Sequence, residues 1–235
     1  MNPPGEESME HRDETAEQVW ERSGLRLKRH FQESTQRMRE QALGSKGYDP
    51  ARLFRWGQMM SMAVVRMMEA AEERFGAAGQ EALCQALVEL GKEIGKEVLC
   101  GFQLAPGTPR IQAVSSFVTY VNEEIWASPE VPRLVDENTC VCDVLWCPHQ
   151  DHYKAFDCRV QRYIVQGLLE AFQEETGIAV DARFTQIIPK GAETCRFEIK
   201  TIACSQPRQW SRYSQELSLR ALQRAGSAGD SSKAP

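Results

Sequence analysis

The chain of 235 residues has no stretch approaching the roughly 20 consecutive apolar residues of a membrane-spanning helix. Residues 1–15 are rich in Glu, Pro and Gly and lack the apolar run of a secretory signal. No glycine-rich phosphate loop follows a predicted strand, and the Gly-x-Ser-x-Gly and His-Glu-x-x-His motifs are missing. These absences argue against a nucleotide fold and the standard hydrolase signatures, and they predict a cytoplasmic protein without a membrane partner.

Basic residues are also not in excess, since 28 Lys and Arg stand against 33 Asp and Glu, for a net charge of -5. We therefore expect no nucleic-acid partner. The hydrophobic fraction of 42% with 26% charged residues is typical of a folded protein.

The first half of the chain has helical periodicity. We predict a disordered leader over residues 1–14 and a helical region over 15–128, with helices near 16–43, 50–75, 80–99 and 111–122. Asp49 is placed to cap the second helix, with Pro50 at its first position. Trp56, Met60 and Met67 of that helix recur at three-to-four spacing, which predicts core packing.

The second half changes character after Pro129. Strands are predicted over 130–135 and 140–146, a long helix over 151–175 closed by Gly177, and two further strands over 180–188 and 194–202. The fold class is therefore α+β: a helical N-terminal half packed on a small antiparallel β-sheet with one long helix across it. Residues 129–204 form the α+β region that holds the chemistry, in one unit with the helices, and 205–235 form a flexible tail that begins with a short fraying helix. The N-terminal helices cover the sheet or a second subunit, so a homo-oligomer is one expectation.

Cysteine is abundant, and it gathers in one segment. Residues 140–158 hold four of the eight cysteines, two of the four histidines and three aspartates. Thiolate and imidazole suit zinc or iron, so Cys140, Cys142, Cys147 and Cys158 are candidate metal ligands. Strand alternation argues against one shared ion, because it places Cys140 and Cys142 on the face opposite Cys147.

The same segment offers catalytic groups. Cys147 precedes Pro148 and the predicted helix start, where an imidazole and the helix N-terminus would lower its pKa. His149 and His152 are candidate proton carriers, and Asp157 falls within the predicted core stripe of the helix, so its carboxylate would point inward. The alternatives are capping or surface histidines, a buried Asp satisfied by an arginine or a backbone N–H, and a packed thiol at Cys158. Cys195, in the last strand, belongs to the covered face of the sheet.

These residues carry a family resemblance. Cys147-Pro148, Cys158 and the hairpin with Gly191, Cys195 and Phe197 resemble the L-2-amino-thiazoline-4-carboxylic acid hydrolase family, which shares its closing hairpin with small-molecule-binding domains of the 4-vinyl-reductase type. The resemblance covers about residues 110–202 and implies hydrolytic opening of a cyclic amidine. Ala192 departs from the pattern, since the family commonly has an acidic residue directly after the glycine.

Two functions are therefore expected for a small-molecule partner. As a hydrolase, the chain would use Cys147 or Cys195 as the thiol and Asp157 with His149 or His152 for proton transfer, and Arg159, Arg183 or Arg196 would hold a substrate carboxylate. As a non-catalytic sensor-type domain, it would bind a small molecule or a metal in a thiol-lined apolar pocket. Aromatic residues are the expected lining of that pocket: Trp126, Trp146, Phe156, Phe184 and Phe197.

Overall fold

The computed structural model describes residues 29–100, 102 and 105–231. The predicted leader and the start of the first predicted helix lie outside these residues. The helices are α2 (Arg29–Met38), α3 (Ala51–Val98), α4 (Arg110–Tyr120), α5 (Arg159–Thr176) and α6 (Gln209–Ser231), with π-helical turns η1 (Arg39–Leu43) and η2 (Val121–Ile125) and a 3-10 turn η3 (Ile188–Lys190). The strands are β1 (Glu130–Asp136), β2 (Thr139–Val144), β3 (Val180–Gln186) and β4 (Cys195–Thr201).

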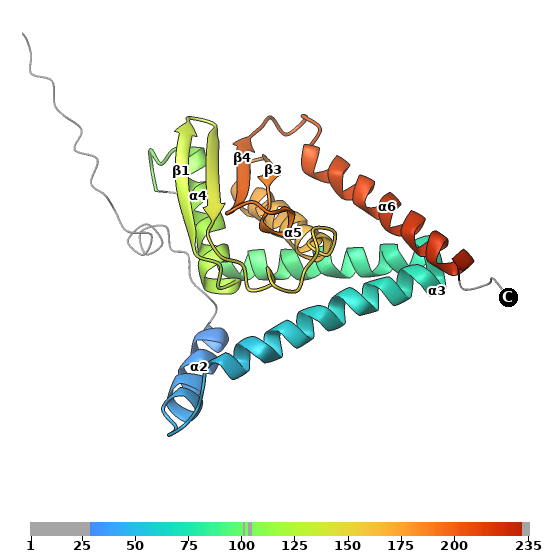
Figure 1. Cartoon of the computed structure of the whole chain (residues 1–235). Coiled ribbons are helices and arrows are strands. Elements are labelled where there is room, and N and C mark those ends of the chain that lie inside the picture. The colour runs from blue at the N-terminus through green and yellow to red at the C-terminus, as the bar shows by residue number, and fades with distance from the viewer. Residues whose placement is uncertain (1–28, 101, 103–104, 232–235) are drawn as a thin grey trace, which may run out of the picture.

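The four strands form one antiparallel sheet in the order β1-β2-β4-β3 (Figure 1). Its inner face carries the buried side chains of Cys140, Cys142, Phe197 and Ile199, which join the main hydrophobic core with α4 and α5. Its outer face carries ion pairs such as Arg196 Nε with Asp143 Oδ1, 2.7 Å apart. This alternation confirms the predicted α+β fold and the predicted facing of Cys140 and Cys142.

The long helix α3 is two helical arms joined at Gly76. Gly76 has φ 59° and ψ -137°, a conformation that only glycine adopts readily, and the chain reverses direction there (Figure 1). The predicted helices over 50–75 and 80–99 correspond to these arms. Asp49 Oδ1 accepts a hydrogen bond from the backbone N–H of Ala51 at 3.0 Å, as expected of a capping side chain.

The second arm of α3 and the helix α5 approach so closely that their backbones touch. A Cβ added at Gly167 would lie 1.9 Å from the carbonyl oxygen of Val88, and one at Gly91 would lie 2.0 Å from that of Ile164. Glycine at both positions therefore fixes how α5 lies along α3, and α5 supplies one wall of the pocket described below.

Helix α6 occupies the segment predicted as a flexible tail, so that prediction is wrong for residues 209–231. The Asp181 carboxylate of β3 accepts hydrogen bonds from the backbone N–H groups of Gln209 and Trp210 at 2.9 and 3.1 Å. Trp210, Leu217 and Ala221 are buried against the rest of the molecule. The sequence could have indicated this packing, because Leu217 follows Trp210 by about two helical turns and Ala221 follows Leu217 by about one turn.

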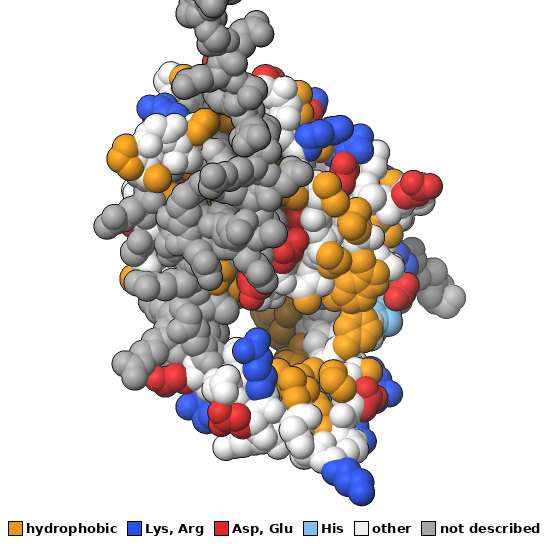
Figure 2. Space-filling view, turned by 90° about the vertical axis from the view of Figure 1, so that its left-hand side faces the viewer, with side chains coloured by type: hydrophobic (Ala, Val, Ile, Leu, Met, Phe, Trp, Pro, Cys, Tyr) orange, Lys and Arg blue, Asp and Glu red, His pale blue; other side chains and the backbone are white. Residues whose placement is uncertain are grey.

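The predicted core stripe of the first α3 arm is also wrong. Trp56 is 60% exposed, and Met60 and Met67 are exposed too, because this arm is packed mainly through Val65 and Met68. Figure 2 shows exposed hydrophobic side chains gathered around a hollow on one face of the molecule. None of the described helices is long and apolar enough to cross a membrane.

Candidate functional site

A cavity of about 180 Å³ lies between the segment 145–158, the start of α5, the β3–β4 hairpin and α6. A single buried water needs only about 10–15 Å³, so the cavity has room for a small organic molecule. Its apolar wall comes mainly from four elements of the fold, through Trp126, Val144, Val165, Phe184, Ile187 and Leu217. We refer to it as the thiol pocket, because three cysteines also line it.

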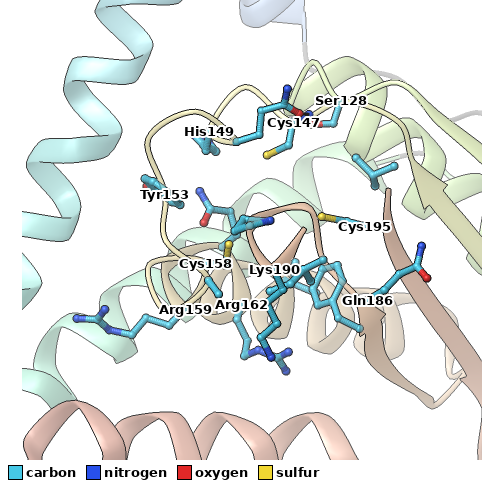
Figure 3. Close-up of a pocket in the computed structure, with 18 of the residues that line it drawn as sticks. Ser128, Cys147, His149, Tyr153, Cys158, Arg159, Arg162, Gln186, Lys190 and Cys195 are labelled. Atoms are coloured by element: carbon cyan, nitrogen blue, oxygen red, sulfur yellow. Dashed lines mark hydrogen bonds between the residues drawn. The ribbon is translucent and has the colours of Figure 1, made fainter. Parts of the chain in front are cut away.

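Cys147, Cys158 and Cys195 are these three cysteines. They come from the 145–158 segment, the residue before α5, and the first residue of β4, and their sulfur atoms point toward the same space (Figure 3). Strand pairing contributes to the arrangement, because Cys195 pairs with Val144 at the end of β2, directly before the segment that carries Cys147. Cys147 and Cys195 therefore line one hollow together with Cys158.

The thiols are held in their protonated form. Burial raises the pKa of Cys147, Cys158 and Cys195 above the ordinary value of 9.0, to about 12 for Cys158. Hydrogen bonds from the backbone of His149 and Gln150 act in the opposite direction on Cys147 but are outweighed by burial. The prediction of a low pKa at Cys147 is therefore wrong, and its reason is structural: no helix begins at Pro148.

The helix predicted over 151–175 begins only at Arg159. Residues 149–158 form turns instead, and the Asp157 carboxylate accepts the backbone N–H of Lys154 at 2.8 Å. Asp157 therefore closes a turn rather than lying in a helical core stripe, and it lines a second cavity on the other side of the segment. The predicted inward carboxylate is absent from the lining of the thiol pocket.

The two histidines of the segment also separate. His149 lines the thiol pocket, its ring stacks on Tyr153 with centroids 4.7 Å apart, and burial lowers its pKa. Its Nδ1 atom is buried and has no hydrogen-bond partner in the part of the chain that the structure describes. His152 is exposed and lines the second cavity with Asp157. Of the predicted proton carriers, only His149 reaches the thiol pocket.

Arg159 lies on the pocket wall as predicted, but its charge is already compensated. Its Nη2 atom is 3.0 Å from Glu72 Oε2, and the two side chains are only 2% and 5% exposed. The pair joins α5 to the first arm of α3, and Gln80 donates a hydrogen bond to Glu72 from the second arm. Arg159 therefore has a structural role here, although no described residue hydrogen-bonds its Nε atom.

Arg162 and Lys190 also line the thiol pocket and were not predicted from the sequence. Arg162 is 7% exposed, and its guanidinium lies 3.7 Å from the ring centroid of Tyr213 and 4.3 Å from that of Trp210. Arg162 lies one turn after Cys158 and almost one turn before Val165, so a cation within that otherwise apolar stripe was the available signal.

The remaining predicted site residues lie at varying distances from the pocket. Phe184 lines it, whereas Phe197 lies in the core beneath it. Trp146 packs against Phe54 of α3, with centroids 5.7 Å apart, and Arg183 pairs with Glu198 on the exposed face of the sheet. Trp126 lines the pocket, and Phe156 lines the second cavity.

The predicted zinc or iron site does not form. Among the described residues, no three His, Cys, Asp or Glu side chains are placed to hold a metal ion. Cys140 and Cys142 are buried in the core on the inner face of β2, while Cys147 and Cys158 line the pocket. The four thiols therefore belong to two environments, as the strand alternation suggested.

Comparisons with known proteins give one close relative. No family model matches the chain. A crystal structure of trafficking protein particle complex subunit 3 from Naegleria fowleri, covalently bound to palmitic acid, superposes with a TM-score of 0.43 at 13% identity, over 62% of this chain and 95% of that one. An uncharacterized protein of Archaeoglobus fulgidus is 40% identical over 198 residues, which cover 82% of this chain and 87% of the relative. The chain therefore belongs to the same protein family as this archaeal protein.

Proposed function

We propose that the protein binds a small, mainly apolar organic molecule in the thiol pocket and acts as a binding or sensing domain rather than a catalyst. The supporting observation is the lining itself: apolar side chains from four elements, three protonated thiols, and no Asp or Glu. A preformed apolar cavity with a few polar groups is the usual form of a small-molecule site.

Unpartnered polar atoms support the same proposal. His149 Nδ1, Arg159 Nε and Gln161 Oε1 are buried without a hydrogen-bond partner among the described residues, and all three residues line the pocket. Such a group costs about 1–3 kcal/mol when it stays unsatisfied. A ligand with polar atoms at these places would recover part of that cost, while its apolar part contacts the rest of the wall.

The free thiols indicate the cellular compartment of the protein. All eight cysteines are free, and six of them are at least partly buried. Free cysteines persist where thiols are kept reduced, so we propose that the protein works in the cytoplasm.

Fluorescence titration with aminoanthracene, a neutral apolar dye, tests the proposed function. We expect saturable binding with an emission shift to the blue. Ala155→Trp, which would fill the pocket from the 145–158 segment, should abolish this binding, whereas Ala203→Trp, at an exposed position after β4, should leave it unchanged. Equal binding to all three proteins, or none to the wild type, would contradict the proposal.

Ring-opening hydrolysis of a thiazoline carboxylate is the second candidate function. It is favoured by one specific arrangement: Cys147, His149 and Cys195 line the same pocket. With Asp157 and His152 outside that pocket, proton transfer would depend on His149 alone. Incubation with 2-amino-thiazoline-4-carboxylate should then give ring-opened product that is lost in Cys147→Ser, and no turnover by the wild type would exclude this function.

A further inference from the structure

The charges of the thiol pocket differ in sign from those of the whole chain. The chain has a net charge of -5, yet the described residues that line the pocket include Arg159, Arg162 and Lys190 and no Asp or Glu. Glu72 compensates Arg159 from behind the wall. The other two lining cations are Arg162 and Lys190.

Arg162 is a buried cation without a carboxylate partner among the described residues. Its guanidinium lies against the ring faces of Tyr213 and Trp210 and 5.7 Å from the ring centroid of Phe184. Aromatic faces attract a cation, but they do not offer the pair of hydrogen-bond acceptors that a carboxylate offers to a guanidinium. Burial lowers the pKa of Arg162 to about 10, and the neighbours that act against this are Tyr213, Cys158 and Tyr163 rather than an acid.

Lys190 brings a second positive group to the same pocket. It ends the 3-10 turn η3 in the β3–β4 hairpin, is exposed, and has no ion pair with any residue in the described part of the chain. In Figure 3 the side chains of Lys190 and Arg162 extend toward the same side of the pocket, the side nearest α6. In this view the thiols of Cys147, Cys158 and Cys195 lie farther from α6.

We propose that the ligand is an amphipathic organic carboxylate whose anionic group pairs with Arg162, assisted by Lys190, while its apolar part lies against the thiol-lined wall. This inference rests on the proposed function and specifies the ligand class. The planar guanidinium donates two parallel hydrogen bonds to a carboxylate, and the aromatic rings hold it in one orientation. Its low exposure strengthens the interaction, because solvent screens a buried pair poorly.

Calorimetric titration at neutral pH with octanoate, octanol and octylamine tests this inference, since the three probes share one apolar chain and differ in charge. Octanoate should bind the wild type at least about tenfold more tightly than octanol, the factor expected for one charge-assisted hydrogen-bonding pair. Octylamine should bind more weakly than octanol. Octyl phosphate, as a further arm, tells whether a phosphate is preferred to a carboxylate, and such a preference would overturn the carboxylate assignment.

Arg162→Met removes the charge and keeps an unbranched side chain up to the position of Nε. We expect it to lower octanoate affinity at least about tenfold and to leave octanol affinity within about twofold. Arg183→Met, on the exposed face of β3, is the matched control and should change neither. Lys190→Gln, at an exposed position where folding is not at risk, should weaken octanoate a few-fold and reduce its dependence on salt.

Two results separate the inference from the proposed function. Equal affinities for octanoate and octanol, both lost in Ala155→Trp, would overturn the anion site and leave the apolar pocket standing. Binding of none of the probes would overturn both. If Arg162→Met does not fold, the octanoate-to-octanol ratio of the wild type and the effect of Lys190→Gln still decide the matter.

Discussion

At the scale of single residues, the chemistry of the site follows from burial. Cys147, Cys158 and Cys195 share a pocket in which desolvation disfavours the thiolate, and no acid in the lining offsets the charge of Arg162. A pocket of neutral thiols and one buried cation without an acidic partner in the described part of the chain is suited to hold a ligand, whereas nucleophilic catalysis by a cysteine requires a thiolate.

Thiol alkylation as a function of pH tests this assignment. At neutral pH, iodoacetamide should modify the exposed Cys100 and Cys204 well before Cys147, Cys158 and Cys195, and the rates for the pocket thiols should keep rising above pH 9.0, because only the thiolate reacts. Peptide mass spectrometry resolves each cysteine. Labelling of Cys147 ahead of Cys204 at neutral pH would instead support the activated nucleophile predicted from the sequence.

The raised pKa values also set the alkaline limit of stability. A thiol with a pKa above 9.0 in the folded state binds its proton more tightly there than in the unfolded state. Its contribution to stability is therefore complete below pH 9.0 and decreases as the pH rises through the folded-state values. Urea unfolding should show this fall above pH 9.0.

At the scale of elements, the crossing of α3 and α5 determines where the pocket wall stands. Gly167→Ala should lower the free energy of unfolding by about 1–3 kcal/mol, since the new methyl group would overlap the carbonyl oxygen of Val88. Gly57→Ala, in the first arm of α3, where no atom lies within 4 Å of the added Cβ, should instead raise it by about 0.5–1 kcal/mol. Urea unfolding measures both, and equal effects would contradict the close crossing.

Helix α6 depends on its anchor at the sheet. Asp181→Ala removes the acceptor of the Gln209 and Trp210 N–H groups, so we expect a loss of about 1 kcal/mol and faster hydrogen exchange in α6. Asp151→Ala, at an exposed turn position, is the control. Unchanged exchange in α6 of the Asp181 variant would mean that the buried Trp210 and Leu217 hold the helix without the cap.

Most of the elements were predictable, and their contacts were less so. Local patterns in the sequence predicted the strands and the two arms of α3. These patterns are the alternation at Cys140 and Cys142, the capping residue Asp49 and the helix break at Gly76. The start of α5 was missed because the Asp157 turn interrupts a segment with helical periodicity. The role of Arg162 depends on aromatic residues up to 51 positions away, on α6, which no spacing rule reveals.

At the scale of the whole molecule, the first arm of α3 leaves an apolar face exposed. Trp56, Met59, Met60 and Met67 are all exposed on it, and the homo-oligomer expected from the sequence stays a prediction. Sedimentation velocity should show association that increases with concentration and is weakened by Trp56→Glu. A single monomeric species at every concentration would contradict it.

The proposed function and the proposed ligand class both require that a ligand binds in one hollow lined by three cysteines from different elements. Cysteine protection tests it most directly: alkylation by N-ethylmaleimide is followed at each cysteine with and without saturating octanoate. We expect octanoate to slow the alkylation of Cys147, Cys158 and Cys195 together and to leave the alkylation rates of Cys100 and Cys204 unchanged. Equal rates with and without octanoate at the three pocket cysteines, or equal slowing at all five, would contradict it.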